Sequence, residues 1–87
     1  MAETSALEFP CEFPIKMMGR DSAKFRTTAR ALVENHAGSV ADSAVQAAVS
    51  RNGRFVSVTV TITATSQQQL DDIYRDVSLH DDVLMAL

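Results

Sequence analysis

Residues 54–65 read RFVSVTVTITAT, and the strict alternation of apolar and hydroxyl side chains in this stretch constrains the fold more than any other feature. Successive side chains of a β-strand point to opposite faces of the sheet. The pattern therefore predicts a strand with one face in the core and the other left uncovered. The apolar set is Val56, Val58, Val60 and Ile62, and the uncovered set is Phe55, Ser57, Thr59, Thr61 and Thr63.

Two further strands are predicted before this one. Residues 13–18 alternate in the same way, with Lys16 and Met18 on the uncovered face. A weaker alternating run lies within residues 40–50, and an Asn-Gly dipeptide separates it from the strand described above. Asn-Gly between two alternating runs is a strong hairpin signal, because both residues tolerate a positive φ. These two strands are therefore expected to be antiparallel neighbours.

Two stretches carry apolar residues at helical spacing. Asp21 or Ser22 can cap the first helix, which is expected to end near Gly38. Ser66 begins the second helix with the serine and glutamine of a capping box, and a last short strand is expected at residues 83–87. The apolar helix positions are Phe25, Ala29, Leu32 and Val33 in the first helix and Leu70, Ile73, Tyr74 and Val77 in the second.

The resulting order, β-α-β-β-α-β, predicts an α+β ferredoxin-like sandwich. In this arrangement right-handed crossovers place the first and third strands at the centre of a four-stranded antiparallel sheet, with both helices on one face. We expect residues 1–8 to be a flexible tail and residues 9–87 to form a single domain. The other face of the sheet stays open, and it carries the hydroxyl row together with Lys16 and Met18.

Composition limits the classes of function. With 46% hydrophobic and 22% charged residues in 87, the chain is expected to be a small soluble domain. Its formal net charge of −3 gives no support for non-specific electrostatic binding to nucleic acid or to an anionic membrane. No stretch suggests a membrane span, and the N-terminus lacks the features of a signal peptide, so a cytoplasmic location is expected. No cofactor or metal motif stands out.

Several single groups have plain structural explanations. Cys11, the one cysteine, fits a small packing group better than a reactive thiol. His36 and His80 lack the paired spacing of a metal site and are expected to be structural or solvated. Arg30 and Glu34 are four residues apart on a predicted helix, and an exposed pair of this kind adds only a few tenths of a kcal/mol, on the order of 0.3. None of these groups indicates an enzyme.

Separate segments of the chain also agree in order and spacing with a known family. They are residues 9–19 (FPCEFPIKMMG), 35–37 (NHA), 57–65 (SVTVTITAT) and 82–87 (DVLMAL). From Leu7 to Leu87 the chain resembles the YbeD-like family of small bacterial proteins. The resemblance implies a ferredoxin-like fold similar to the regulatory ACT domains of metabolic enzymes, a cytoplasmic location and no established biochemical activity.

The leading hypothesis is a non-enzymatic regulatory or interaction module. It would act through a protein partner, a homodimer formed through the sheet, or a small anionic effector bound at the loop after the first strand. The loop residues are Gly19, Arg20, Asp21 and Ser22, which offer close backbone approach, a helix N-terminus and a cation. The aspartate that precedes a Pro-Gly in ACT domains is missing, and this weakens the case for an amino-acid effector.

Two alternatives remain open. The uncovered face can bind RNA if aromatic side chains on the central strands stack on bases, but it offers only Phe55, with Arg51 and Arg54 beside it. An acylphosphatase-like hydrolase would use Arg20 and Asn52. The glycine-spaced phosphate loop of such enzymes is absent, and the Asn-Gly turn accounts for the asparagine.

Overall fold

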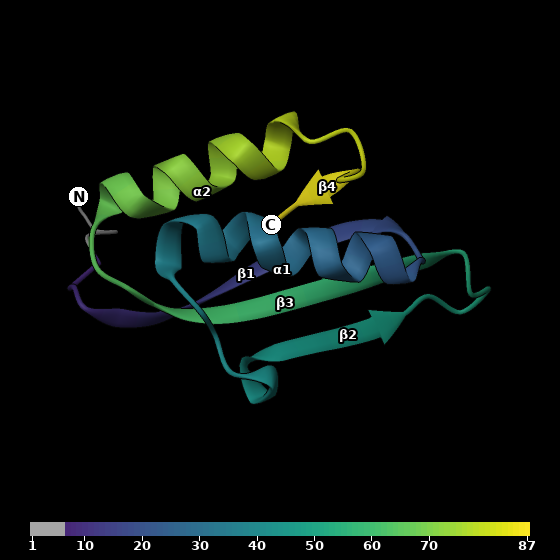
Figure 1. The fold of residues 1–87 in the computed structure, drawn as a ribbon, viewed down its shortest axis with the longest axis horizontal. Coiled ribbons are helices and arrows are strands. Elements are labelled where there is room, and N and C mark those ends of the chain that lie inside the picture. The colour runs from purple at the N-terminus through teal and green to yellow at the C-terminus, as the bar shows by residue number, and fades with distance from the viewer. Residues whose placement is uncertain (1–6) are drawn as a thin grey trace.

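The computed structural model describes residues 7–87 and has the predicted element order. The elements are β1 (Cys11–Arg20), α1 (Ala23–Ala37), the short 3-10 helix η2 (Asp42–Ala44), β2 (Val45–Val49), β3 (Phe55–Ala64), α2 (Gln67–Leu79) and β4 (Met85–Ala86). The strands lie in the order β2-β3-β1-β4, and every neighbouring pair is antiparallel. Figure 1 shows both helices on one face, with β2 at an edge beyond the helix layer. The ferredoxin-like prediction is confirmed; of the predicted tail, residues 1–6 lie outside the described residues.

The strands β1 and β3 form the centre of the sheet and pair along their whole length, from Cys11 opposite Ala64 to Arg20 opposite Phe55. The first strand is thus longer at both ends than predicted. Pro14 does not interrupt the strand. The backbone N–H and C=O of Lys16 bond Leu87 on the β4 side, and the backbone groups of Pro14, two residues earlier, face the same side. The proline therefore removes no bond to β3.

Gly19 was predicted to end the first strand, and this was wrong. It lies inside β1, buried, opposite Val56. A Cβ atom at this position would lie 2.5 Å from Cε1 of Phe25 and 2.6 Å from the carbonyl oxygen of Asp82. The glycine is therefore present because α1 and the segment before β4 approach the strand closely, and not because the chain turns here.

The core lies between the sheet and the helices, and the alternation predicted it correctly. Every second residue of the central strands faces the helices, and these positions are buried except at the start of β1, where Cys11 and Phe13 are partly buried. The core residues are Ile15, Met17, Phe25, Ala29, Val33, Val56, Val58, Val60, Ile62, Ala64, Leu70, Ile73 and Val77. Within residues 7–87 no helix has the length and apolar character needed to cross a membrane.

Serine side chains cap both helices, as predicted. The hydroxyl of Ser22 accepts a hydrogen bond from the backbone N–H of Phe25 at 2.9 Å, and that of Ser66 accepts from Gln69 at 3.1 Å. Such a bond satisfies one of the free N–H groups of the first turn. At the other end of α1, Gly38 takes a φ of 78° and its N–H bonds the carbonyl of Glu34.

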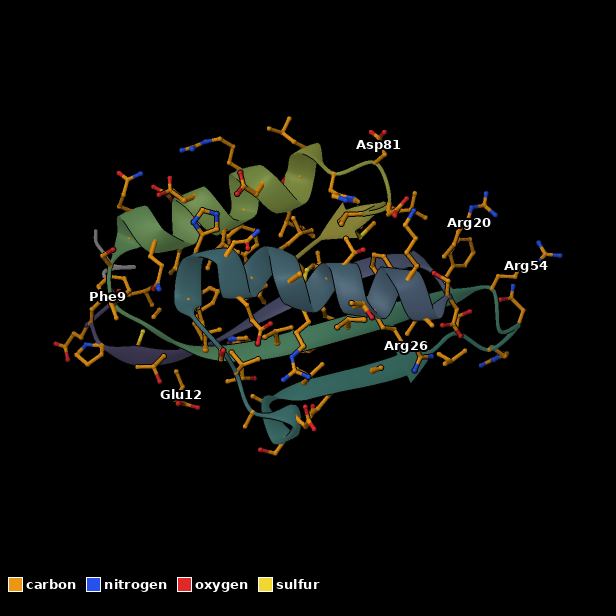
Figure 2. The ribbon with its side chains drawn as sticks, viewed as in Figure 1. Phe9, Glu12, Arg20, Arg26, Arg54 and Asp81 are labelled. Carbon is orange, nitrogen blue, oxygen red and sulfur yellow. The ribbon has the colours of Figure 1, made fainter. Side chains whose placement is uncertain are left out.

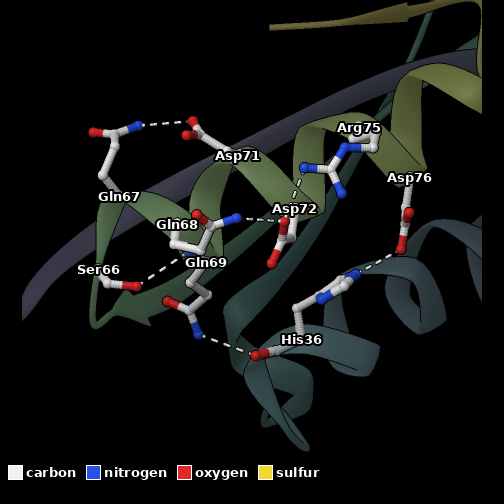
Figure 3. A network of polar contacts seen from close by, with 9 residues as sticks. All are labelled: His36, Ser66, Gln67, Gln68, Gln69, Asp71, Asp72, Arg75 and Asp76. Carbon is white, nitrogen blue, oxygen red and sulfur yellow. Dashed lines mark hydrogen bonds and ion pairs between the residues drawn. The ribbon is translucent and has the colours of Figure 1, made fainter.

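The glutamine of the predicted capping box, Gln69, also connects α2 to α1. The side chain of Gln69 accepts from the N–H of Thr65 at 2.8 Å and donates to the carbonyl of His36 at 3.1 Å. His36 Nε2 lies 2.6 Å from a carboxylate oxygen of Asp76 (Figure 3). A side chain expected to cap α2 therefore also satisfies the last turn of α1, and the histidine connects the same two helices.

The predicted pair of Arg30 and Glu34 forms, with Nε 3.4 Å from a carboxylate oxygen, but it is part of a larger set of contacts and not a minor surface pair. Arg30 contacts Asp42 at 2.7 Å and donates to the carbonyl of Val40, while Glu34 accepts from the N–H of Val40 at 2.9 Å. The hydrogen bond to Asp42 is the main reason that the pKa of Arg30 lies above its ordinary value, and Glu34 adds to the effect. Together these side chains hold the connection between α1 and β2 against the helix.

The hairpin between β2 and β3 is confirmed, but its turn differs from the expected one. The N–H of Gly53 bonds the carbonyl of Ser50, so Arg51 and Asn52 are the central residues of the turn. Gly53 follows with a φ of 75°. The Asn52 side chain accepts from the N–H of Arg54 at 3.1 Å and from the Ser50 hydroxyl at 3.0 Å. These side-chain bonds stabilise a loop of residues 51–54 in place of a tight turn with Asn52 and Gly53 at its centre.

Candidate functional site

The uncovered face of the sheet brings the predicted open-face residues together. The register of β1 and β3 places their outward side chains opposite one another, because directly paired residues share a face. The pairs are Glu12 with Thr63, Pro14 with Thr61, Lys16 with Thr59, Met18 with Ser57, and Arg20 with Phe55. Lys16, Met18, Phe55, Ser57, Thr59, Thr61 and Thr63 therefore form one surface, which we call the open face.

The edge strands add apolar residues to the open face that the sequence did not indicate. Met85 of β4 lies opposite Met18, and Leu87 exchanges backbone hydrogen bonds with Lys16. The exposed fractions of Met85 and Leu87 are 51% and 61%. On the other side, Ala48 of β2 lies opposite Ser57. Residues 83–87 were predicted as a strand, but its register with β1 depends on tertiary packing that no local pattern reports.

Two shallow hollows lie along the β2 side of the open face. One, of about 290 Å3, is lined by Met18, Ala48, Val49, Ser50, Phe55, Val56 and Ser57. The other, of about 390 Å3, is lined by Lys16, Gln46, Ala47, Ala48, Ser57 and Thr59. The hydroxyls of Ser57, Thr59 and Thr61 form no hydrogen bond within residues 7–87. They are available to a partner, beside methionine and phenylalanine side chains that would lose water on contact.

The residues predicted for the loop after the first strand line a hollow only in part. A hollow of about 270 Å3 lies where β1 meets α1, lined by Arg20, Ser22, Lys24, Phe25, Asp81, Asp82 and Leu84. Two of the four predicted residues, Arg20 and Ser22, line this end hollow. Gly19 is buried against Phe25, and Asp21 pairs with Arg26 at 2.9 Å and donates its N–H to the carbonyl of Arg54.

The end hollow combines charges of both signs. Arg20 and Lys24 contribute cations, and Asp81 and Asp82 contribute carboxylates; Figure 2 shows Arg20 and Asp81 at the same end of the molecule. The acidic residues come from the turn before β4, in which Nδ1 of His80 accepts from the N–H of Asp82 at 3.1 Å. No local pattern indicated that these two segments line one hollow, because they are far apart in the chain.

Lysine and arginine residues are concentrated at this end of the molecule. Of the eight in the chain, Arg20 and Lys24 line the end hollow, and Arg51 and Arg54 lie in the adjoining hairpin loop (Figure 2). Phe55, half-buried, is the aromatic residue of the open face beside them. Asn52, which the hydrolase alternative required, is occupied in the hairpin turn.

Within the described part of the chain, no group of three or more His, Cys, Asp or Glu side chains is placed to hold a metal ion. Cys11 is free and partly buried, and it packs against the core. The two histidines make the structural contacts described above. The open face and the end hollow are therefore the two surfaces whose chemistry suits binding.

Comparison with known proteins places the chain in a family. The profile of a family described as "Protein of unknown function (DUF493)" matches residues 4–87. The chain is 40% identical to UPF0250 protein NE1487 of Nitrosomonas europaea over the whole of both chains. It is 48% identical to a UPF0250 protein of Chromobacterium violaceum, over 92% of this chain and 90% of the other.

A solved structure with the same fold is the solution structure of protein HP0495 from H. pylori. It matches with a TM-score of 0.75 and 17% identity, over 99% of this chain and 90% of the other. The fold and the family resemblance read from the sequence are both confirmed. The chain belongs to the UPF0250 (DUF493) family of small bacterial proteins of unknown function, the family that the name YbeD-like denotes.

Proposed function

We propose that this protein is a non-enzymatic cytoplasmic interaction module and that its open face binds another protein. The observation that carries the proposal is the difference between the two faces of the sheet. Helices cover the core side of the two central strands, whereas the other face presents an uncovered apolar band of Met18, Met85 and Leu87 beside hydroxyls that have no partner in the described chain. Apolar patches rimmed by polar groups are typical of protein-binding surfaces.

A protein partner fits this surface better than RNA does. Stacking of a base on an aromatic side chain contributes about 1–3 kcal/mol, and Phe55 is the single aromatic of the open face. Methionine side chains adapt to irregular apolar partners, and threonine hydroxyls can pair with polar groups of a protein backbone. The net charge of −3 also opposes a phosphate backbone.

Contacts within the chain support the absence of catalysis. His36 contacts Asp76, and the Nδ1 atom of His80 accepts a backbone N–H in the turn before β4, so both imidazoles already make structural contacts. The hydroxyls of Thr59 and Thr61 have no basic side chain within hydrogen-bond distance among residues 7–87. A hydroxyl nucleophile needs an adjacent base, and the open face does not supply one.

Site-specific photo-crosslinking tests the proposal. A crosslinking amino acid replaces Thr59 on the open face or, as a matched control, Ser78 on the exposed side of α2. We expect a discrete protein adduct in cells from position 59 only. The adduct is identified by mass spectrometry, and the purified partner is expected to bind the natural chain and to lose binding to Met18→Asp. Equal labelling from both positions, or a purified partner indifferent to Met18→Asp, would contradict the proposal.

A second candidate function is the binding of a small carboxylate-containing effector in the end hollow. Arg20 and Lys24 suit a carboxylate, and Asp81 and Asp82 would favour a ligand that also carries a positive group. A zwitterionic α-amino acid combines these features. The acidic lining opposes a dicarboxylate.

Thermal unfolding with an amino-acid panel and with succinate tests this candidate. A ligand at a hundred times its dissociation constant adds about 2.7 kcal/mol to stability. We expect at least one zwitterion to raise the melting temperature, succinate to have no effect, and Arg20→Ala to abolish the shift while Arg75→Ala preserves it. The absence of a shift with every member of the panel would rule out this site for such ligands.

A further inference from the structure

We propose that a second copy of this chain pairs with the first through β2, antiparallel about a two-fold axis, so that the two sheets join into one. The inference is independent of the binding partner proposed for the open face. It rests on the hydrogen-bond direction, the side chains and the charges of a single edge strand.

The backbone of β2 has free groups along its outer edge. The N–H of Ser50 bonds the carbonyl of Phe55 on β3, so alternate residues back along the strand also face β3. The backbone N–H and C=O groups of Val45, Ala47 and Val49 therefore point away from β3, toward the outer edge of the sheet. The N–H of Val45 bonds Asp42 within η2, which leaves the outward groups of Ala47 and Val49 without a partner in the described chain.

This edge lacks the features that prevent pairing. Its sequence, VQAAV, contains no charge and no proline, and the strand pairs with β3 without a bulge. Natural edge strands usually carry such features, because a bare edge invites another strand. The opposite edge of the sheet, β4, is only two residues long.

The helix-facing side of β2 is apolar but uncovered. Val45, Ala47 and Val49 lie opposite Val60, Val58 and Val56 and so share the face of the core. Figure 1 shows no helix over β2, and Val49 is 50% exposed. The core side of the sheet thus continues outward by one strand without a cover. A second β2 would place three more apolar side chains beside these.

A two-fold axis at Ala47 gives a consistent register. Ala47 of the two copies would exchange two hydrogen bonds, and each Val49 N–H would donate to the carbonyl of Val45 in the other copy. The Val45 N–H stays bonded within its own η2. Each valine then lies opposite the other valine of the partner, and the pairing breaks no bond of the monomer.

The charges at the two ends of β2 complement each other in this register. The hairpin loop with Arg51 and Arg54 follows the strand, and Asp42, whose side chain is 95% exposed, precedes it. Antiparallel pairing brings the basic loop of one copy beside the acidic turn of the other, twice. A parallel arrangement would instead bring like charges together.

Sedimentation and amide hydrogen exchange test the pairing on the natural chain. Because the contact is small, we expect a dimer that dissociates on dilution and in high salt. In the concentrated protein the amides of Ala47 and Val49 should exchange slowly, and on dilution their exchange should accelerate at least tenfold. A monomer at millimolar concentration, or a dimer in which these two amides exchange freely, would overturn the proposal.

Three variants isolate the edge. Val49→Lys adds a charge to it, and Ala47→Pro removes an outward donor; we expect both to stay folded and monomeric, while the control Ser78→Lys dimerises normally. The reversal Arg51→Asp should weaken the dimer at low salt, whereas Arg75→Asp on α2, which changes the net charge equally, should not. An unchanged dimer in a folded Arg51→Asp protein would contradict the proposed charge pairing, and none of these results depends on the crosslinks from Thr59.

Discussion

The two faces of the sheet are built from the same strands and differ in almost every other respect. Adjacent residues of β1 illustrate this: Ile15 has an exposed fraction of 0%, whereas Lys16 is exposed. The backbone hydrogen bonds between the strands serve both faces equally. The difference teaches that folding free energy is concentrated on the helix side, so substitutions on the open face are expected to cost little stability.

The largest expected effect tests this difference directly. Ile15→Ala removes a fully buried side chain and should lower the free energy of unfolding by about 2–5 kcal/mol. Lys16→Ala, one residue away on the other face, should change it by no more than about 0.5 kcal/mol. Urea unfolding measures both. Similar losses from the two variants would show that the open face contributes to stability as the core does.

A second prediction concerns the close packing of Phe25 and Asp82 against Gly19 on the helix side of the sheet. Gly19→Ala would force a methyl group against the Phe25 ring and the Asp82 carbonyl, and we expect a loss of about 1–3 kcal/mol. In a Phe25→Ala background the additional loss should be smaller, because the ring atoms are gone. Strictly additive losses in urea unfolding would exclude the ring as the obstacle.

A third prediction compares a hydroxyl that caps a helix with one on the open face. Ser66→Ala removes the acceptor for the N–H of Gln69 and should cost about 1 kcal/mol. Thr61→Val keeps the shape of its side chain and loses no described hydrogen bond, so the free energy of unfolding should stay within about 0.5 kcal/mol. A cost at Thr61 equal to that at Ser66 would reveal a structural role for the hydroxyl row.

The smallest expected effect lies at the rim between the faces. The phenol of Tyr74 donates to the carbonyl of Leu87 at 2.9 Å and packs edge-on against Phe13. Tyr74→Phe should cost about 0.5 kcal/mol at neutral pH. Amide exchange of residues 84–87 should rise in the variant, because their attachment to α2 is weaker.

The same residue predicts a pH dependence. Burial raises the pKa of Tyr74 above its ordinary value. The unfolded chain loses the phenol proton near pH 10, and the folded chain holds it to higher pH, so stability falls as pH rises from about 10 through the folded pKa. Tyr74→Phe should flatten this fall. Ultraviolet titration measures the folded pKa directly, because the chain has one tyrosine.

Much of the fold was predictable because it depends on local patterns. The alternation in β3 identified both of its faces, and the serine caps and apolar spacings located both helices. Even the pairing of Lys16 and Met18 with the hydroxyl row followed from the topology. The patterns and caps are carried by near neighbours in the chain, and the pairing follows from the order of the elements.

The errors share a different cause. Gly19 continues its strand because Phe25 and Asp82 need the space, and Arg30 binds Asp42 across a loop. Lys24 and Asp82 line the same end hollow although long stretches of chain separate them. Spacing rules describe neighbours within one element. Contacts made when the helices and β4 dock depend on three-dimensional placement, and the sequence alone did not indicate them.

The long separation of the two central strands has a consequence for folding kinetics. Pairing of β2 with β3 closes only a short loop. Pairing of β1 with β3 must close a much longer one, because α1 and β2 lie between them in the sequence. Loop closure makes the first step fast and the second slow. During that delay β3 is an exposed strand on a growing chain. Its alternating threonines keep one side of the strand compatible with water, and this is expected to lower its tendency to aggregate before the sheet is complete.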